Sequence, residues 1–229
     1  EHDRVPVRWG RLAMAATAHG AQRDPHEATA RWALVVFVTG AVAITVFDAL
    51  QLLGLLFFLK GIPVWALIVR VTARLGVAGH RRLLAGLFLG SLGDIALGLT
   101  QAFPPEVPFL VGLGLFLAGH VCYLAAFVPE FRPAPARIPA MAAVVLVALA
   151  MGGLLIPRTA PATGPVLGYL AVLSTMAIVA LGRRSPSGQV GAGALVFLLS
   201  DGLIAVNVFV RPIPLANSWV FATYFLAQF

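Results

Sequence analysis

The chain contains eight long apolar runs in quick succession, separated by short segments rich in proline, glycine and arginine. A helix needs about 20 mostly apolar residues to cross a hydrocarbon core of about 30 Å. The runs are close to this length, and the prolines and glycines between them end helices and start turns. The sequence therefore predicts an all-α integral membrane protein with eight transmembrane helices. The expected spans are residues 32–50, 53–74, 82–99, 109–128, 138–156, 164–181, 188–210 and 213–229.

The composition fits a polytopic membrane protein and excludes other classes. Hydrophobic residues make up 60% of the 229 residues and charged residues only 11%, whereas soluble domains carry about 25% charged residues. A water-soluble enzyme and a disordered chain are therefore excluded. Cys122 is the single cysteine, which excludes an internal disulfide and a cysteine-based zinc cluster. The net charge of +7 does not indicate nucleic-acid binding, because the charges lie between the apolar runs and not along one polar face.

The N-terminal segment differs from the rest of the chain. Residues 1–30 carry several arginines and acidic residues and no apolar run long enough to span a bilayer. We therefore expect a flexible or interfacial segment at 1–30 and one transmembrane domain at 31–229. The boundary between the first two spans is the least defined, because Asp48 and Lys60 interrupt the apolar region. That boundary is expected between residues 48 and 62.

Basic residues are distributed unevenly between the two sides of the predicted domain. With eight spans, the N-terminal segment and the even-numbered loops lie on one side and contain thirteen arginines, whereas the other side contains only Lys60, Arg158 and Arg211. Cytoplasmic segments of membrane proteins carry the excess of lysine and arginine. We therefore expect both termini in the cytoplasm, and the inner (plasma) membrane of a bacterium as the location.

Two carboxylates lie inside the predicted spans, Asp94 in the third and Asp201 in the seventh. A charged side chain at mid-bilayer costs about 2.5–3.5 kcal/mol, so it usually faces a cavity or a partner. The residues before the two aspartates resemble each other, which allows an arrangement of two four-helix halves. A catalytic pair is the favoured interpretation. The alternatives are structural carboxylates that accept hydrogen bonds across helices, and a proton or ion pathway.

Other polar side chains share helix faces within the spans. His120 and Tyr123 are three residues apart in the fourth span, and Tyr224 and Gln228 are four apart in the eighth. These four are candidates for positioning a substrate and water. For His120 the alternative is a packing role, and for the two tyrosines it is a hydrogen bond between helices.

Asp48 and Lys60 complete the candidate binding residues. Asp48 lies close to a predicted helix end, where an interfacial role is favoured, and Lys60 either extends its amine to the interface or contacts a phosphate group. A catalytic zinc site usually needs three protein ligands, and His120 is the only histidine well inside a span. The sequence also has no Gly-x-Ser-x-Gly motif of a serine hydrolase. No metal and no cofactor are expected.

Four segments, in this order along the chain, resemble the YhhN-like lysoplasmalogenase family. The resemblance runs from about Lys60 to the C-terminus and does not cover the first 30 residues. One departure is Lys60-Gly-Ile-Pro63, where the family tends to place proline directly after lysine. The segments are residues 87–97, 114–127, 197–205 and 223–228.

The resemblance implies an eight-helix integral membrane hydrolase. Members of the family cleave the vinyl ether bond of lysoplasmalogens to give a fatty aldehyde and glycerophosphoethanolamine or glycerophosphocholine. The family's two intramembrane aspartates correspond to Asp94 and Asp201. The implied partners are a lysophospholipid, water and the surrounding membrane lipids, so residues 31–229 would form the catalytic domain.

This chemistry suits two carboxyl groups. A vinyl ether is hydrolysed when a proton is added to the carbon beyond the one bonded to oxygen. Water then captures the oxocarbenium-like cation as a hemiacetal, which collapses to aldehyde and alcohol. One carboxylic acid can supply the proton while a second, ionised carboxylate stabilises the cation and orients water. The sequence leaves open which aspartate is the acid.

Three other functions remain open at this point. A proton-coupled transporter would use the aspartates to relay protons between two rocking halves. A lysolipid-binding protein would hold its ligand without turnover. A different lysolipid hydrolase would cleave an acyl ester and release a fatty acid. The sequence also leaves open the head-group preference and whether the protein forms a homodimer.

Overall fold

The computed structural model describes residues 25–50, 57–184 and 188–229. Within these ranges every regular element is helical, and the predicted all-α fold is confirmed. The α-helices are α2 (Pro25–Ala49), α3 (Gly61–Leu75), α4 (Arg81–Gly98), α5 (Glu106–Phe127), α6 (Ile138–Leu155), α7 (Thr163–Leu181), α8 (Gln189–Phe209) and α9 (Ala216–Gln228). Short 3-10 turns lie at Phe57–Lys60, Leu99–Gln101, Val128–Glu130, Pro135–Arg137 and Ile156–Arg158.

The predicted apolar runs all correspond to helices, but these differ in their capacity to cross a membrane. Among the described residues, five helices are long and apolar enough to do so by themselves: α2, α5, α6, α7 and α8. α3 has 15 residues and α9 has 13, which gives only about 20–23 Å at 1.5 Å per residue. α4 contains two arginines and an aspartate. The protein is therefore an integral membrane protein. Of the eight expected spans, five are helices that are long and apolar enough to cross a membrane.

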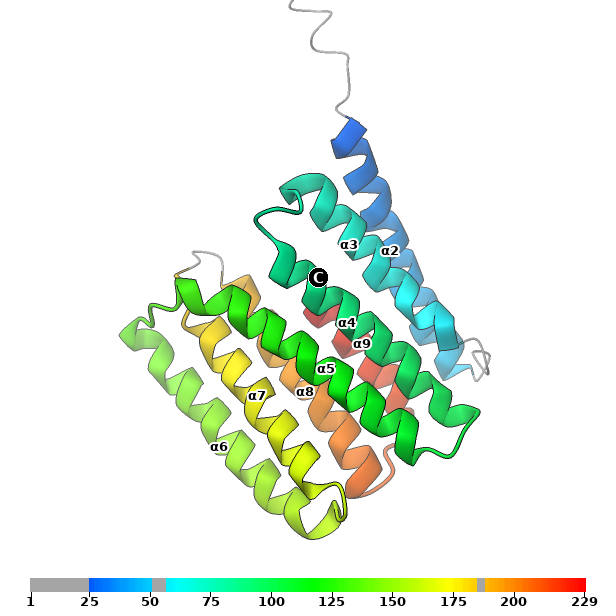
Figure 1. The fold of residues 1–229 in the computed structure, drawn as a ribbon, viewed down its shortest axis with the longest axis vertical. Helices are drawn as coiled ribbons and strands as arrows, with labels where there is room; N and C mark the ends of the chain where they lie inside the picture. The colour runs from blue at the N-terminus through cyan, green and yellow to red at the C-terminus, as the bar shows by residue number, and fades with distance from the viewer. Residues whose placement is uncertain (1–24, 51–56, 185–187) are drawn as a thin grey trace, which may run out of the picture.

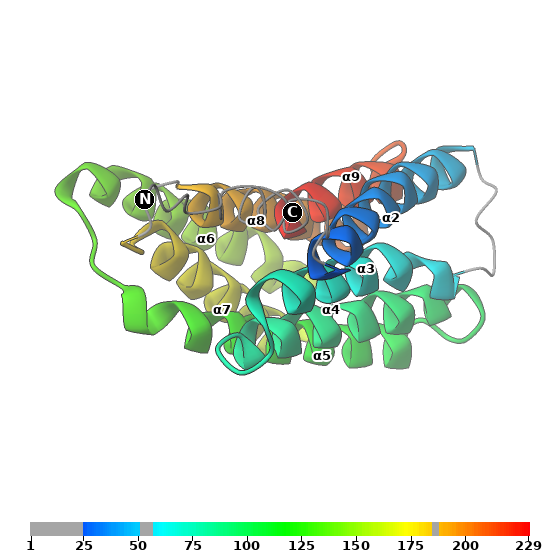
Figure 2. The ribbon, with the colours of Figure 1, turned by 90° about the horizontal axis from the view of Figure 1, so that it is seen from above.

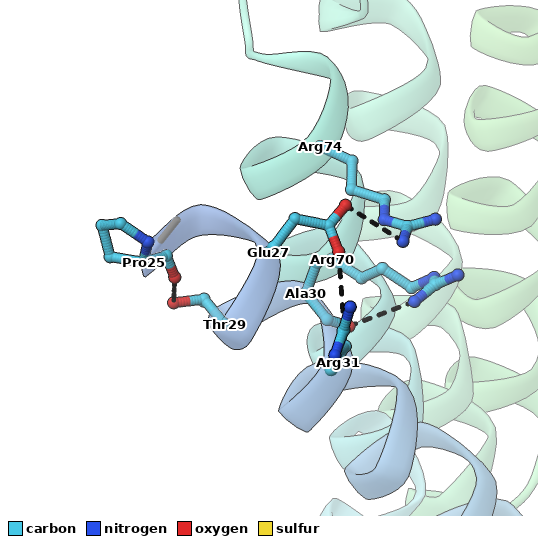
Figure 3. A network of polar contacts seen from close by, with 7 residues as sticks. All are labelled: Pro25, Glu27, Thr29, Ala30, Arg31, Arg70 and Arg74. Atoms are coloured by element: carbon cyan, nitrogen blue, oxygen red, sulfur yellow. Dashed lines mark hydrogen bonds and ion pairs between the residues drawn. The ribbon is translucent and has the colours of Figure 1, made fainter. Parts of the chain in front are cut away.

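α2 begins earlier than the first predicted span. Residues 25–30, expected in the N-terminal segment, form its first turns (Figure 3). Glu27 pairs with Arg74 of α3 at 3.3 Å, and Arg70 of α3 donates a hydrogen bond to a backbone carbonyl of α2 at 3.1 Å. Charged contacts thus extend the helix beyond its apolar run. An extension of this kind cannot be predicted from the apolar pattern, because its residues are polar. The rest of the predicted segment, residues 1–24, lies outside the described residues.

Two candidate residues, Asp48 and Lys60, lie at the two ends of the connection between α2 and α3. α2 ends at Ala49 and α3 begins at Gly61, so both limits lie in the expected interval from 48 to 62. Residues 51–56 between them lie outside the described residues. Asp48 is consequently in the last turn of α2, and Lys60 immediately precedes α3.

Seven of the described helices form a closed ring. Going round it, α2, α3, α4, α5, α7, α8 and α9 each contact the next, and α9 closes the ring against α2. In Figure 2, α2, α8 and α9 lie over α3, α4 and α5. α6 lies outside the ring, mainly against α7, at one edge of the molecule in Figure 1. The first four helices and the last four therefore pack as successive neighbours within each half, but the two halves are not equivalent.

The arginine-rich end of the bundle is held together by an ion pair and by hydrogen bonds from arginine side chains to backbone carbonyls. Arg183 pairs with Glu130 at 2.7 Å, and Arg137 donates to the carbonyls of Leu181 and Arg183, each at 2.8 Å. These contacts tie the α5–α6 connection to the α7–α8 connection. Because arginines also satisfy the free carbonyls at helix C-termini, several basic residues at this end have a structural role in addition to any effect on membrane orientation.

Glycines let α4 and α5 approach closely, as small residues do in membrane helix pairs. A Cβ at Gly119 of α5 would lie 3.1 Å from the backbone carbonyl oxygen of Gly86 in α4. A Cβ at Gly93 would lie 2.7 Å from the Phe116 ring. The close approach fixes the position of the C-terminal half of α4, which carries Asp94.

Gly119→Ala tests this close packing. Because the added methyl group meets a backbone oxygen that cannot rotate away, we expect the variant to lose about 1–3 kcal/mol of stability. Gly114→Ala on the same helix is the matched control, since nothing lies within 4 Å of its Cβ position. Thermal unfolding in detergent measures both. Equal midpoints for the two variants would contradict the packing described.

Candidate active site

A cavity of about 400 Å³ lies among α4, α5, α8 and α9. This volume falls in the range of small-molecule sites, which is about 300–1,000 Å³. Asp94 and Asp201 both line it, together with Tyr224 and Lys60. The rest of the wall is largely apolar, and includes Leu97, Phe116, Ile204, Val208, Val220 and Phe221. The two carboxylates predicted to lie within the membrane, Asp94 and Asp201, therefore line the same cavity.

Both aspartates project into the interior of the ring. α4 and α8 are not neighbours in the ring, yet their carboxylates line the same cavity. Asp94 lies four residues before the end of α4, about 6 Å along the axis, and Asp201 lies eight residues before the end of α8, about 12 Å. Both lie closer to the end of the bundle with the α4–α5 and α8–α9 connections. The arginine-rich connections lie at the opposite end.

The two carboxyl groups have different hydrogen-bond environments. The Tyr169 hydroxyl of α7 donates to Oδ2 of Asp201. Oδ2 of Asp94 is buried and makes no hydrogen bond of good geometry to the described residues, although the Tyr224 hydroxyl lies beside the carboxyl group. The two groups interact electrostatically. Carboxyl groups that are paired but differ in environment can take different roles in acid–base chemistry.

Tyr169 was not among the sequence candidates. The sequence does contain an indication of its importance, because the chain has only three tyrosines and all three lie in apolar runs. The other two, Tyr123 and Tyr224, were selected because each has a polar neighbour one helical turn away. Tyr169 has no such neighbour on its own helix, so its partner appears only when α7 and α8 are packed together.

Tyr224 is the candidate tyrosine on the cavity wall. Its hydroxyl is buried next to Asp94 and Gln228, and makes no hydrogen bond of good geometry to any described residue. Tyr123 does not line the cavity, and its hydroxyl donates to Oε1 of Gln228 at 3.2 Å. Tyr123 and Gln228 thus support Tyr224 from outside the cavity.

His120 is fully buried and does not line the cavity. Its Nδ1 lies 2.7 Å from the Phe116 carbonyl oxygen of its own helix, and so carries the hydrogen of this bond. Its ring packs edge to face against Phe197 at 4.8 Å and Tyr169 at 5.4 Å between centroids. In this position His120 holds the Tyr169 ring beside Asp201, which matches the packing alternative more closely than substrate contact.

Lys60 is buried at the cavity and Asp48 lies behind it. Nζ of Lys60 is 4.8 Å from the centroid of the Phe221 ring, and the amine interacts electrostatically with Asp48 and Asp94. The interfacial alternative for Lys60 is not what the structure shows, because the side chain is only 7% exposed. Asp48 does not line the cavity, and its Oδ2 accepts a hydrogen bond from Ser218 of α9 at 3.0 Å.

The donor set of the cavity consists of carboxyl, hydroxyl, amide and amine groups. Within the described ranges, no group of three or more His, Cys, Asp or Glu side chains is arranged to hold a metal ion. The carboxyl, hydroxyl and amine groups of the cavity can transfer protons and form hydrogen bonds to a bound molecule and to water.

These features define a class: a polytopic α-helical membrane protein with two carboxyl groups on a cavity inside its helix ring. The chain belongs to the YhhN family, whose family model matches residues 55–229. The matched part includes every candidate residue except Asp48.

Curated relatives carry a common name. The chain is 35% identical to lysoplasmalogenase TMEM86B of Sus scrofa over 171 residues, which is 74% of this chain and 70% of that protein. It is 35% identical over 139 residues to a lysoplasmalogenase of Mycobacterium bovis, covering 57% of this chain and 51% of the relative. The human TMEM86B lysoplasmalogenase is 32% identical over 155 residues, covering 66% and 62%. No solved structure matches the chain significantly.

Proposed function

We propose that this protein is a lysoplasmalogenase, an integral membrane hydrolase that cleaves the vinyl ether bond of a single-chain ether lipid. The observation that carries the proposal is the pair Asp94 and Asp201, which line one intramembrane cavity in different hydrogen-bond environments. The lysoplasmalogenase names of relatives at 35% identity support the same substrate class.

The reaction needs one proton donor and one water molecule. The proton is added to the vinyl carbon remote from oxygen, and the positive charge is shared between the other vinyl carbon and the ether oxygen. Water adds to that carbon and returns one proton to an ionised carboxyl group, so the acid is restored. The resulting hemiacetal breaks its bond to the glycerol oxygen, and the proton of its hydroxyl group passes to that oxygen. The products are a fatty aldehyde and a glycerophosphodiester.

The two environments support an assignment of the roles that the sequence left open. Asp201 accepts a hydrogen bond from Tyr169, which suits an ionised carboxylate that stabilises the cation and orients water. Oδ2 of Asp94 makes no hydrogen bond of good geometry, although the Tyr224 hydroxyl lies beside the carboxyl group, and this looser environment suits the protonated acid that delivers its proton to carbon. Tyr224 lies next to Asp94 on the cavity wall and is placed to orient the reacting ether.

The remaining cavity residues suit a lysophospholipid. The apolar part of the wall would accommodate the alkenyl chain, since burial of apolar surface is favourable at about 25 cal/mol per Å². The buried amine of Lys60 is the cavity's cationic group, and we assign to it the contact with the lipid phosphate. Tyr123, Gln228, His120 and Asp48 act indirectly, by positioning the residues that touch the substrate.

We further propose that the cavity faces the non-cytoplasmic side of a bacterial inner membrane. The residues that line it extend to Thr100, Pro105 and Asn217, at the end of the bundle with few basic residues. Excess arginine marks the cytoplasmic side, so both termini would be cytoplasmic. The substrate would then enter from the outer leaflet.

Asp94→Asn and Asp201→Asn test the proposed chemistry. Each removes a group needed for proton transfer or charge stabilisation, so aldehyde release should fall by about 10² to 10⁴-fold. Glu130→Gln, at the opposite end of the bundle, is the control. Mass spectrometry of products from purified protein in detergent micelles measures turnover without a gradient, which a transporter cannot produce. Near-normal turnover in either variant would remove that aspartate from the mechanism.

Tyr169→Phe tests the role of Asp201. The variant keeps the ring against His120 but removes the donor, so kcat should fall by about 10- to 100-fold with little change in KM, as expected for loss of a hydrogen bond to a charged group. Thr175→Ala on the same helix is the control, because that hydroxyl bonds only to the Ala171 carbonyl of its own helix. A loss confined to KM would contradict the assigned role.

Asn217→Cys tests the orientation. In a Cys122→Ala background, a membrane-impermeant maleimide added to intact spheroplasts should label Cys at position 217. Arg81→Cys, which lies at the other end of the bundle, should be labelled only after permeabilisation. The reverse labelling pattern would place the cavity on the cytoplasmic side.

A further inference from the structure

The outer part of the cavity carries a carboxylate that the proposed chemistry does not use. Glu106, the first residue of α5, lines the cavity and is exposed. It forms no ion pair within the described part of the chain, whereas Glu27 and Glu130 both pair with arginines. An acidic side chain at the entrance of a lipid site leaves a negative charge available to a bound molecule.

Two aromatic rings lie on the same part of the wall. Phe109 is three residues after Glu106 and so shares its helix face, and Phe209 lies at the end of α8. The rings pack edge to face, with centroids 5.7 Å apart, and both line the cavity. A carboxylate beside aromatic rings is the combination that binds ammonium groups, including quaternary ones.

The cavity also carries charges of both signs. Lys60 is buried and the two aspartates are partly buried, whereas Glu106 is exposed. A lysophospholipid with an ethanolamine or choline head group presents the ether bond first, then the anionic phosphate and finally the cationic nitrogen. The cavity therefore offers a cation for the phosphate and an anion for the nitrogen.

We propose that Glu106, Phe109 and Phe209 form a subsite for the ammonium group of a zwitterionic lysophospholipid. The inference rests on the proposed function and adds the residues that would recognise the cation of an ethanolamine or choline head group, so that a head group without a cation is disfavoured. A simpler role for Glu106 is to stabilise the N-terminus of α5 through the helix dipole. That role changes stability, but it does not discriminate between substrates.

The experiment compares Glu106→Gln with the wild-type protein on two alkenyl lysolipids. One carries phosphoethanolamine and the other a bare phosphate, so the second has the same ether bond and no ammonium group. The wild-type protein should prefer the first substrate by the ratio of kcat/KM values, and the variant should lose about tenfold of this preference, mainly through KM for the ethanolamine lipid. Phe209→Leu should reduce the same ratio of kcat/KM values. An alkenyl lysolipid with a choline head group serves as a third substrate and should show the same loss of preference over the bare phosphate.

A binding measurement separates failure of this inference from failure of the proposed function. Saturated alkyl-ether analogues of the same lipids cannot undergo vinyl ether hydrolysis, and their affinities can be measured in micelles for the wild-type protein and for both variants. Loss of preference for the ethanolamine analogue supports the subsite even if no substrate is turned over. Equal changes for both head groups, or no change, would overturn the subsite and leave the assignment of Asp94 and Asp201 intact.

Discussion

An ionisable side chain within a membrane must face protein or water, and this constraint governs the arrangement of the whole bundle. Asp94 and Asp201 lie on helices that do not pack against each other, so both can be accommodated only if a ring of helices surrounds them. The glycines of α4 and α5 serve this arrangement, because they allow the helix that carries Asp94 to approach its neighbour closely. α6, which contributes no residue to the cavity, lies outside the ring.

The polar groups around the aspartates form two layers. The first layer consists of Tyr224 and Lys60, which line the cavity together with the two aspartates. The second layer lies behind it and consists of three contacting pairs. These pairs are Tyr123 with Gln228, His120 with Tyr169, and Ser218 with Asp48. Because buried polar groups are costly without partners, this second layer keeps the cavity polar at one place in a largely apolar wall. The result is a site in which Asp201 accepts a well-formed hydrogen bond from Tyr169, whereas Asp94 has the Tyr224 hydroxyl beside it without such a bond.

The sequence predicted the features that depend on local pattern and missed those that depend on packing. Helices follow from apolar runs, and the two aspartates stand out because charge in such runs is rare. Tyr169 and Glu106 could not be selected in this way, since Tyr169 meets Asp201 only across two helices and Glu106 has the appearance of an ordinary helix start. His120 was expected near the substrate from its helix position, but Phe197 and Tyr169 from other helices cover it.

The central claim is that a proton is delivered to the vinyl carbon of an ether lipid, and isotope labelling of the product tests it most directly. Purified protein is incubated with an alkenyl lysophospholipid in D₂O, and the aldehyde is trapped at once and analysed by mass spectrometry. The account predicts one deuterium, in a single configuration, on the carbon next to the aldehyde group. Deuterium in both configurations, as protonation of a released enol in solution would give, or release of a fatty acid from an acyl lysolipid in place of the aldehyde, would contradict it.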